Sequence, residues 1–75
     1  MKLTDKELES IYNKMAEGMP DRARKLEILI RRGMSLKYIS NKLIEAKNIS
    51  KEDKAEIFLV IGWKYRQIKE SVGTN

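Results

Sequence analysis

The chain contains no cysteine, no histidine, one proline and few aromatic residues. Without cysteine there is no disulfide and no thiol nucleophile, and without histidine the commonest general base and metal ligand in proteins is missing. Long apolar runs are also missing. The longest, residues 57–63, has seven residues, whereas a membrane-spanning helix needs roughly 20. These absences argue against an enzyme and a membrane protein, and we expect no cofactor and no metal site.

The length of 75 residues leaves room for one small domain, and hydrophobic residues at 41% with charged residues at 36% predict a folded, water-soluble chain. The charged first ten residues contain no apolar segment of the kind found in signal peptides, so we expect a cytoplasmic protein. We expect a single helical domain over residues 1–75, with the last five residues frayed, that functions as a monomer.

Apolar residues recur at helical spacing throughout, and no segment shows the alternation typical of a strand. The predicted helices cover residues 4–17, 22–32, 35–47 and 51–70. The sequence therefore predicts an all-α fold, a compact bundle of four short helices. The fourth helix is apolar almost all round between residues 57 and 63, so we expect the C-terminal helix to be central.

The predicted inward faces define a candidate core. It consists of Leu8, Ile11, Tyr12, Met15, Ala23, Leu26, Leu29, Ile30, Leu36, Ile39, Leu43, Ala46, Ile57, Phe58, Ile61, Tyr65 and Ile68. A glycine inside a helix costs about 1 kcal/mol relative to alanine, so Gly62 predicts a close approach by another helix.

Polar residues predict where the helices begin. Thr4 and Glu7 have the spacing of a capping box, and Ser35 and Ser50 are placed to cap the third and fourth helices. Asp21 is the expected cap of the second helix.

Glycine and proline predict where the first two helices end. Gly18 and Gly33 can each adopt a left-handed conformation after a helix, and Pro20 is expected to follow the first helix as part of a turn.

The charge is unevenly distributed along the chain. Residues 1–21 have three lysines and five acidic groups, residues 22–47 have eight basic and two acidic groups, and residues 48–75 have five basic and four acidic groups. The net charge of +5 is therefore concentrated in the second and third helices, which suggests an anionic partner.

A basic surface with one aromatic ring is the most site-like feature. The candidate nucleic-acid-binding residues are Arg24, Lys25, Arg31, Arg32, Lys37, Tyr38 and Lys42. Lysine and arginine bind phosphate and release counterions, and an exposed tyrosine can stack on a base, which favours single-stranded DNA as the partner. In the alternative interpretation these side chains are only solvated, and Tyr38 packs on a neighbouring residue.

A second hypothesis is a protein-interaction module, such as an inhibitor or a docking domain, that uses an exposed apolar face. Its candidate residues are Ile28, Leu59, Val60 and Trp63. The competing interpretation places Trp63 and Tyr65 in the core.

Known functional motifs give little support for other activities. No phosphate-binding glycine loop of the ATPase or dinucleotide type is present. Residues 33–43 are similar to the first helix of a helix-turn-helix, but an apolar helix follows where a recognition helix should be. The acidic side chains of Glu52, Asp53 and Glu56 suit the start of a helix, and we assign them no metal.

The whole chain resembles the small helical companion, or C-terminal domain, of the bacteriophage T4 recombination helicase UvsW, in particular over residues 33–70, GMSLKYISNKLIEAKNISKEDKAEIFLVIGWKYRQIKE. The resemblance implies an accessory DNA-binding domain that assists a larger helicase polypeptide in recombination and repair, in the host cytoplasm. Helicase motifs are missing from this chain, so the helicase activity would belong to the partner. The resemblance assigns no site residues.

Overall fold

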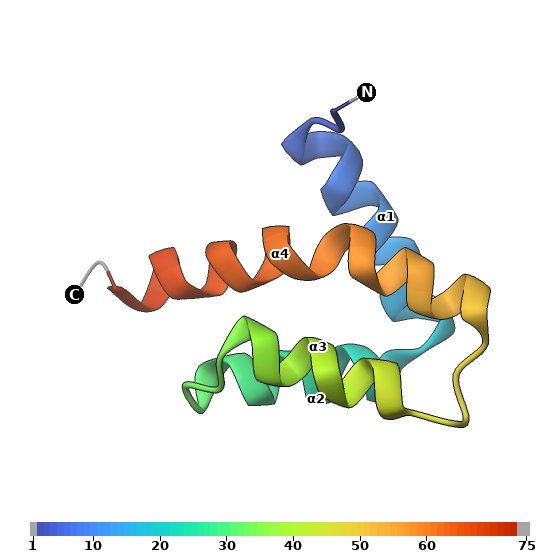
Figure 1. Cartoon of the computed structure of the whole chain (residues 1–75). Helices are drawn as coiled ribbons and strands as arrows, with labels where there is room; N and C mark the ends of the chain where they lie inside the picture. The colour runs from blue at the N-terminus through green and yellow to red at the C-terminus, as the bar shows by residue number, and fades with distance from the viewer. Residues whose placement is uncertain (1, 74–75) are drawn as a thin grey trace.

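The computed structural model describes residues 2–73, and the side chains of residues 2–71. This part of the chain forms four helices and no strand: α1 (Asp5–Gly18), α2 (Pro20–Arg31), α3 (Leu36–Glu45) and α4 (Lys51–Gly73) (Figure 1). The prediction of an all-α bundle is confirmed. However, α4 has 23 residues and is not a short helix.

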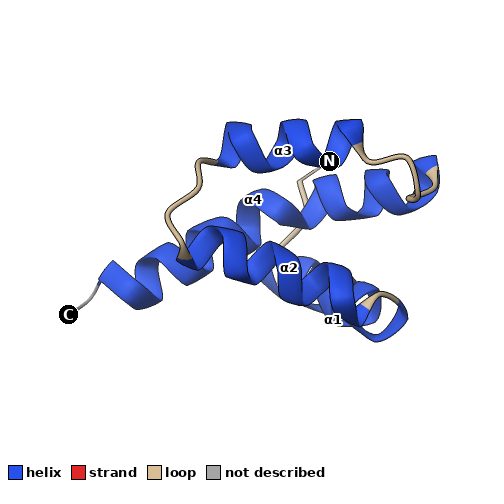
Figure 2. Ribbon diagram, turned by 90° about the horizontal axis from the view of Figure 1, so that it is seen from below, coloured by secondary structure: helices blue, strands red, loops and turns tan. Residues whose placement is uncertain are grey.

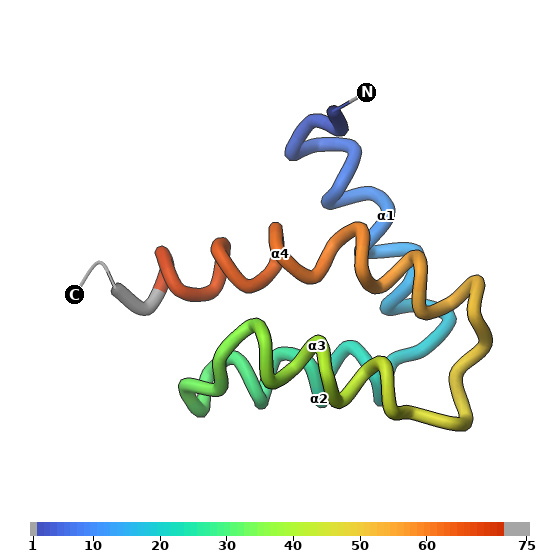
Figure 3. The backbone as a smooth tube through the Cα atoms, in the orientation of Figure 1, coloured from blue at the N-terminus to red at the C-terminus, as the bar shows by residue number. Residues whose placement is uncertain are grey.

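The C-terminal helix α4 is central, as predicted, because it contacts each of the other three helices. In Figure 1, α1 begins above α4 and crosses it, and α2 and α3 lie below α4. The tube in Figure 3 shows how the chain reverses between α2 and α3. Figure 2, seen from below, shows α2 and α3 on either side of α4. The helical hairpin of α2 and α3 therefore rests on α4.

The predicted helix starts at Thr4, Ser35 and Ser50 are confirmed. The Thr4 hydroxyl accepts the Glu7 N–H at 3.2 Å, and the Glu7 carboxylate accepts the Thr4 N–H at 2.9 Å. The bond from the Thr4 backbone lowers the pKa of Glu7, because it stabilises the charged carboxylate. The hydroxyls of Ser35 and Ser50 each accept a backbone N–H three residues later, at 3.0 and 3.1 Å.

The predicted turn between α1 and α2 is wrong in its details. Gly18 belongs to α1 and has no positive φ. The left-handed conformation predicted for Gly33 after α2 is confirmed, because Gly33 has the only positive φ, 87°, in residues 2–73. Pro20 is the first residue of α2, where its missing N–H costs nothing and its fixed φ suits the helix. Met19 alone separates the helices, and Asp21 lies inside α2, not at its cap.

Two predicted helix ends also differ from the structure. The helix α3 ends at Glu45, two residues early, because Ala46 adopts an extended conformation with ψ of 128°. The helix α4 continues through Ser71 to Gly73, where fraying was expected. Residues 74 and 75, which were also expected to fray, lie outside the described residues.

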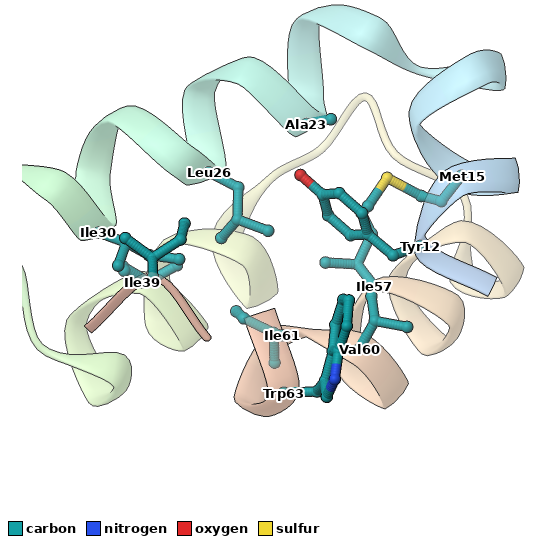
Figure 4. Packing of buried hydrophobic residues seen from close by; sticks show 11 residues of the cluster. Tyr12, Met15, Ala23, Leu26, Ile30, Ile39, Ile57, Val60, Ile61 and Trp63 are labelled. Atoms are coloured by element: carbon teal, nitrogen blue, oxygen red, sulfur yellow. The ribbon is translucent and has the colours of Figure 1, made fainter. Parts of the chain in front are cut away.

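The core gathers apolar side chains from all four helices (Figure 4). Its buried members are Tyr12, Met15, Ala23, Leu26, Ile30, Ile39, Ile57, Val60, Ile61, Trp63 and Ile68. Most of the predicted core is confirmed. The prediction that Leu36 and Phe58 are core residues is wrong, since they are 36% and 39% exposed. Val60, which was not predicted to be in the core, is fully buried. The buried face of α4 is shifted because α1 packs on the flank that carries Val60 and Trp63.

The prediction of a close helix contact at Gly62 is also wrong. A Cβ placed on Gly62 would have no neighbour within 4 Å. Gly62 is half-buried and follows the exposed Phe58 and Leu59, so it lies toward the side of α4 that no other helix covers.

A polar contact joins α1 to α2 beside the core. The Tyr12 hydroxyl donates a hydrogen bond of 2.5 Å to the carboxylate of Glu27. The Tyr12 ring lies 6.0 Å from the Trp63 ring and 4.5 Å from the Lys64 amine. Burial raises the pKa of Tyr12, and the bond to Glu27 raises it further, because both favour the neutral phenol.

Candidate nucleic-acid interface

A groove between α2 and α3 contains the best candidate site. It has a volume of about 560 Å³, and the buried side chains of Leu26, Ile39, Ile57 and Ile61 form its floor. Leu29 and Leu43, each half-buried, continue the apolar lining toward the surface. The volume lies within the range of roughly 300–1,000 Å³ typical of ligand sites.

Three of the predicted binding residues meet at this groove. Lys25 lines it from α2, and Tyr38 and Lys42 line it from α3. All three side chains are exposed, with Tyr38 at 43%. Two helices therefore present basic groups to one groove whose floor is apolar.

Local structure places these side chains on the groove side of their helices. The Ser35 cap bonds the N–H of Tyr38 and so fixes the first turn of α3. Lys42 follows Tyr38 by one helical turn, and its amine lies 5.6 Å from the Tyr38 ring centroid. This cation–π contact orients Tyr38 and Lys42 together at the edge of the groove.

The sequence prediction omitted one cationic residue of the groove. Arg22 is half-buried and lines the groove one turn before Lys25 on α2. Arg22 precedes Lys25 by three residues and the half-buried Leu29 by seven, so the three side chains lie on one face of α2. This spacing in the sequence could have identified Arg22 as a groove residue. Glu45 and Asn48 also line the groove, and they add a carboxylate and an amide to its cationic groups and its tyrosine.

The remaining predicted binding residues do not line this groove, although all of them are exposed. Arg24 and Arg31 line a separate depression of about 410 Å³ together with Ile28. Arg32 and Lys37 are exposed near the turn between α2 and α3 and line neither hollow. The reason is geometric, because positions 22, 25 and 29 of α2 point to one flank whereas 24, 28 and 31 point to the other.

The alternative apolar face is not available as predicted. Val60 is 0% and Trp63 is 8% exposed, so both belong to the core, and the Trp63 ring packs near Tyr12. Ile28 and Leu59 are exposed, but they belong to α2 and α4 respectively. The competing interpretation of Trp63 as a core residue is confirmed.

Residues 2–73 contain neither a metal-binding cluster nor a membrane-spanning helix. No group of three or more acidic side chains there is arranged to hold a metal ion. None of the helices described is long and apolar enough to cross a membrane.

Comparison with known proteins adds no relative. Neither protein-family models nor the sequences of curated proteins nor solved structures gave a match to this chain. The case for a function therefore rests on the groove and its residues.

Proposed function

We propose that the domain binds single-stranded nucleic acid, with single-stranded DNA favoured, and that it does so without catalysis. The observation that carries the proposal is the convergence of Arg22 and Lys25 from α2 with Tyr38 and Lys42 from α3 on one groove. Three cationic side chains along a groove match a phosphate backbone, and one aromatic ring at its edge matches a base.

Electrostatics provides most of the affinity in this proposal. Each phosphate neutralised by a lysine or arginine releases counterions, and for single strands the logarithm of the affinity falls by about 0.7 per contact for each tenfold rise in salt. With about three cations in the groove, binding is modest and strongly dependent on salt. The surrounding net charge of residues 22–47 attracts the strand over a longer range.

The test is a titration of a fluorescently labelled single-stranded oligonucleotide at about 50 and 200 mM salt, with a duplex of equal length as competitor. The groove variant combines Lys25→Ala with Lys42→Ala. The matched control combines Lys6→Ala with Lys14→Ala, two exposed lysines of α1, and it has the same net charge.

We expect the groove variant to lose affinity at least tenfold and its salt slope to fall by about 1.4, which corresponds to two lost phosphate contacts. The control should lose much less, because it changes only the long-range attraction. Equal losses in the two variants would show that net charge alone binds the strand. Failure of the wild type to bind at 50 mM salt would overturn the proposal.

The resemblance to a companion of the T4 helicase UvsW leads us to propose a helper role in recombination or repair. The resemblance alone supports this role, since the comparisons with known proteins gave no match. The test is unwinding of a branched DNA by that helicase with and without the domain. We expect stimulation by the wild type and much less by the groove variant, and no change with either protein would contradict the helper role.

A further inference from the structure

The floor of the groove is more apolar than phosphate binding requires. The buried Leu26 and Ile39 lie beneath the half-buried Leu29 and Leu43, whereas the charged side chains of Lys25 and Lys42 are exposed. A phosphate backbone held by amines at the edge would leave this apolar slot in contact with water. A ligand that fits the whole groove therefore combines an anionic part with an apolar part.

A nucleotide with an unstacked base has this combination. We infer that the groove takes up one unpaired base of a bound strand, with the base over Leu29 and Leu43 and its phosphates on Arg22, Lys25 and Lys42. Tyr38 stands at the groove edge, where its ring stacks on the base or on the next one along the strand. This inference rests on the proposed function and adds the chemical group that the groove selects.

The remaining polar groups of the groove fit the same orientation. Glu45 is exposed on α3 and lines the groove together with Asn48. The Glu45 carboxylate repels phosphate, so the phosphates lie at Arg22, Lys25 and Lys42 and away from Glu45. Carboxylate and amide groups also bond the polar edge of a base, since bases carry both donors and acceptors there.

The inference explains a preference for unpaired nucleotides. In a duplex, the bases are stacked and paired, so a base reaches an apolar slot only after it is flipped out of the helix, at a cost of a few kcal/mol. A single strand, a loop or a frayed end presents bases without most of this cost. A duplex should therefore bind only through the phosphate contacts.

The experiment compares two probes on the wild-type domain, a ten-residue thymidine oligonucleotide and the same deoxyribose-phosphate backbone with every base removed. Base stacking is worth about 1–3 kcal/mol, so we expect the intact probe to bind about fivefold to more than a hundredfold more tightly. Tyr38→Ala should reduce this ratio, and Tyr38→Phe should keep it. The exposed position of Tyr38 allows both changes without loss of the fold.

Methyl NMR spectra provide a second readout on the unmodified protein. The Leu29 and Leu43 methyl signals should shift with the intact probe and stay nearly unchanged with the abasic probe. Equal affinity for the two probes, with both lost in the Lys25/Lys42 variant, would leave nucleic-acid binding intact and overturn the base-binding inference. If neither probe binds at 50 mM salt and an acidic, leucine-containing peptide shifts the same methyl signals, a protein segment occupies the groove and both proposals fail.

Discussion

The hydrogen bond between Tyr12 and Glu27 provides a sharp test of the packing of α1 on α2. Tyr12→Phe removes the hydroxyl and keeps the ring between Trp63 and Lys64. Hydrogen bonds to charged groups contribute about 1.5–3 kcal/mol to stability. Because Glu27 is only half-buried and can be rehydrated, we expect a loss of about 1.5 kcal/mol in the free energy of unfolding at pH 8. For a domain of this size the melting temperature falls by about 6–12 °C.

The pH dependence of this loss follows from the raised pKa of Tyr12. Below the pKa of an unfolded tyrosine, about 10, the phenol is neutral in both states and its full contribution is present. Above pH 10 the unfolded state loses the proton while the folded state keeps it. Stability then falls by up to about 1.4 kcal/mol per pH unit. The advantage of the wild type over Tyr12→Phe should therefore be nearly gone by about pH 11.

The assay is urea unfolding followed by circular dichroism at pH 8 and pH 11 for the wild type and Tyr12→Phe. Because both proteins contain the same lysines, lysine titration cancels in their difference. Tyr38→Phe is the control at pH 8, and we expect it to change stability by less than about 0.5 kcal/mol, because Tyr38 is exposed. A Tyr12→Phe loss below 0.5 kcal/mol at pH 8, or one that persists unchanged at pH 11, would refute the reasoning.

Three further predictions concern packing, glycine and capping, all measured by denaturant unfolding. Ile30→Val should lower the free energy of unfolding by about 0.5–1.5 kcal/mol because Ile30 is 1% exposed, while Ile44→Val should change it by less than about 0.5 kcal/mol because Ile44 is 60% exposed. Equal losses would contradict the difference in burial between the two residues. Gly62→Ala should stabilise the domain by about 1 kcal/mol, since the space around its Cβ position is open, whereas Gly33→Ala should destabilise it by about 1–2 kcal/mol because of the positive φ of Gly33. The opposite order would contradict the backbone conformation of these two glycines. Thr4→Ala should cost about 0.5–2 kcal/mol through the lost capping box, and no loss would show that the cap contributes nothing.

The sequence was most informative about features determined by residues close along the chain. The caps at Thr4, Ser35 and Ser50 depend on neighbours within three residues, so their spacing was sufficient to identify them. The prediction of a turn at Pro20 was wrong because proline is compatible both with a turn after one helix and with the first position of the next helix. Only the packing of α1 against α2 decides between the two.

The inward faces and the site were harder to predict, because they depend on which helix covers which flank. A helical wheel places Phe58 beside Ile57, but α1 packs on the other flank of α4 and leaves Phe58 exposed. The same limitation applies to the basic residues. Their abundance in α2 was plain in the sequence, but only the position of α3 separates Lys25, which lines the groove, from Arg24, which does not.

Under the proposed function, the residues that bind and the residues that stabilise the fold are different ones. The helices α2 and α3 contact each other less than either contacts α4. Leu26 and Ile39 belong to the core, while the exposed Lys25, Tyr38 and Lys42 line the groove at the surface. Since Lys25 and Lys42 are exposed and the floor residues are buried, replacing the lysines should change affinity with little effect on stability, whereas truncating Leu26 or Ile39 should destabilise the whole domain. A groove of this kind can therefore acquire or lose a ligand through surface substitutions while the four-helix core remains intact.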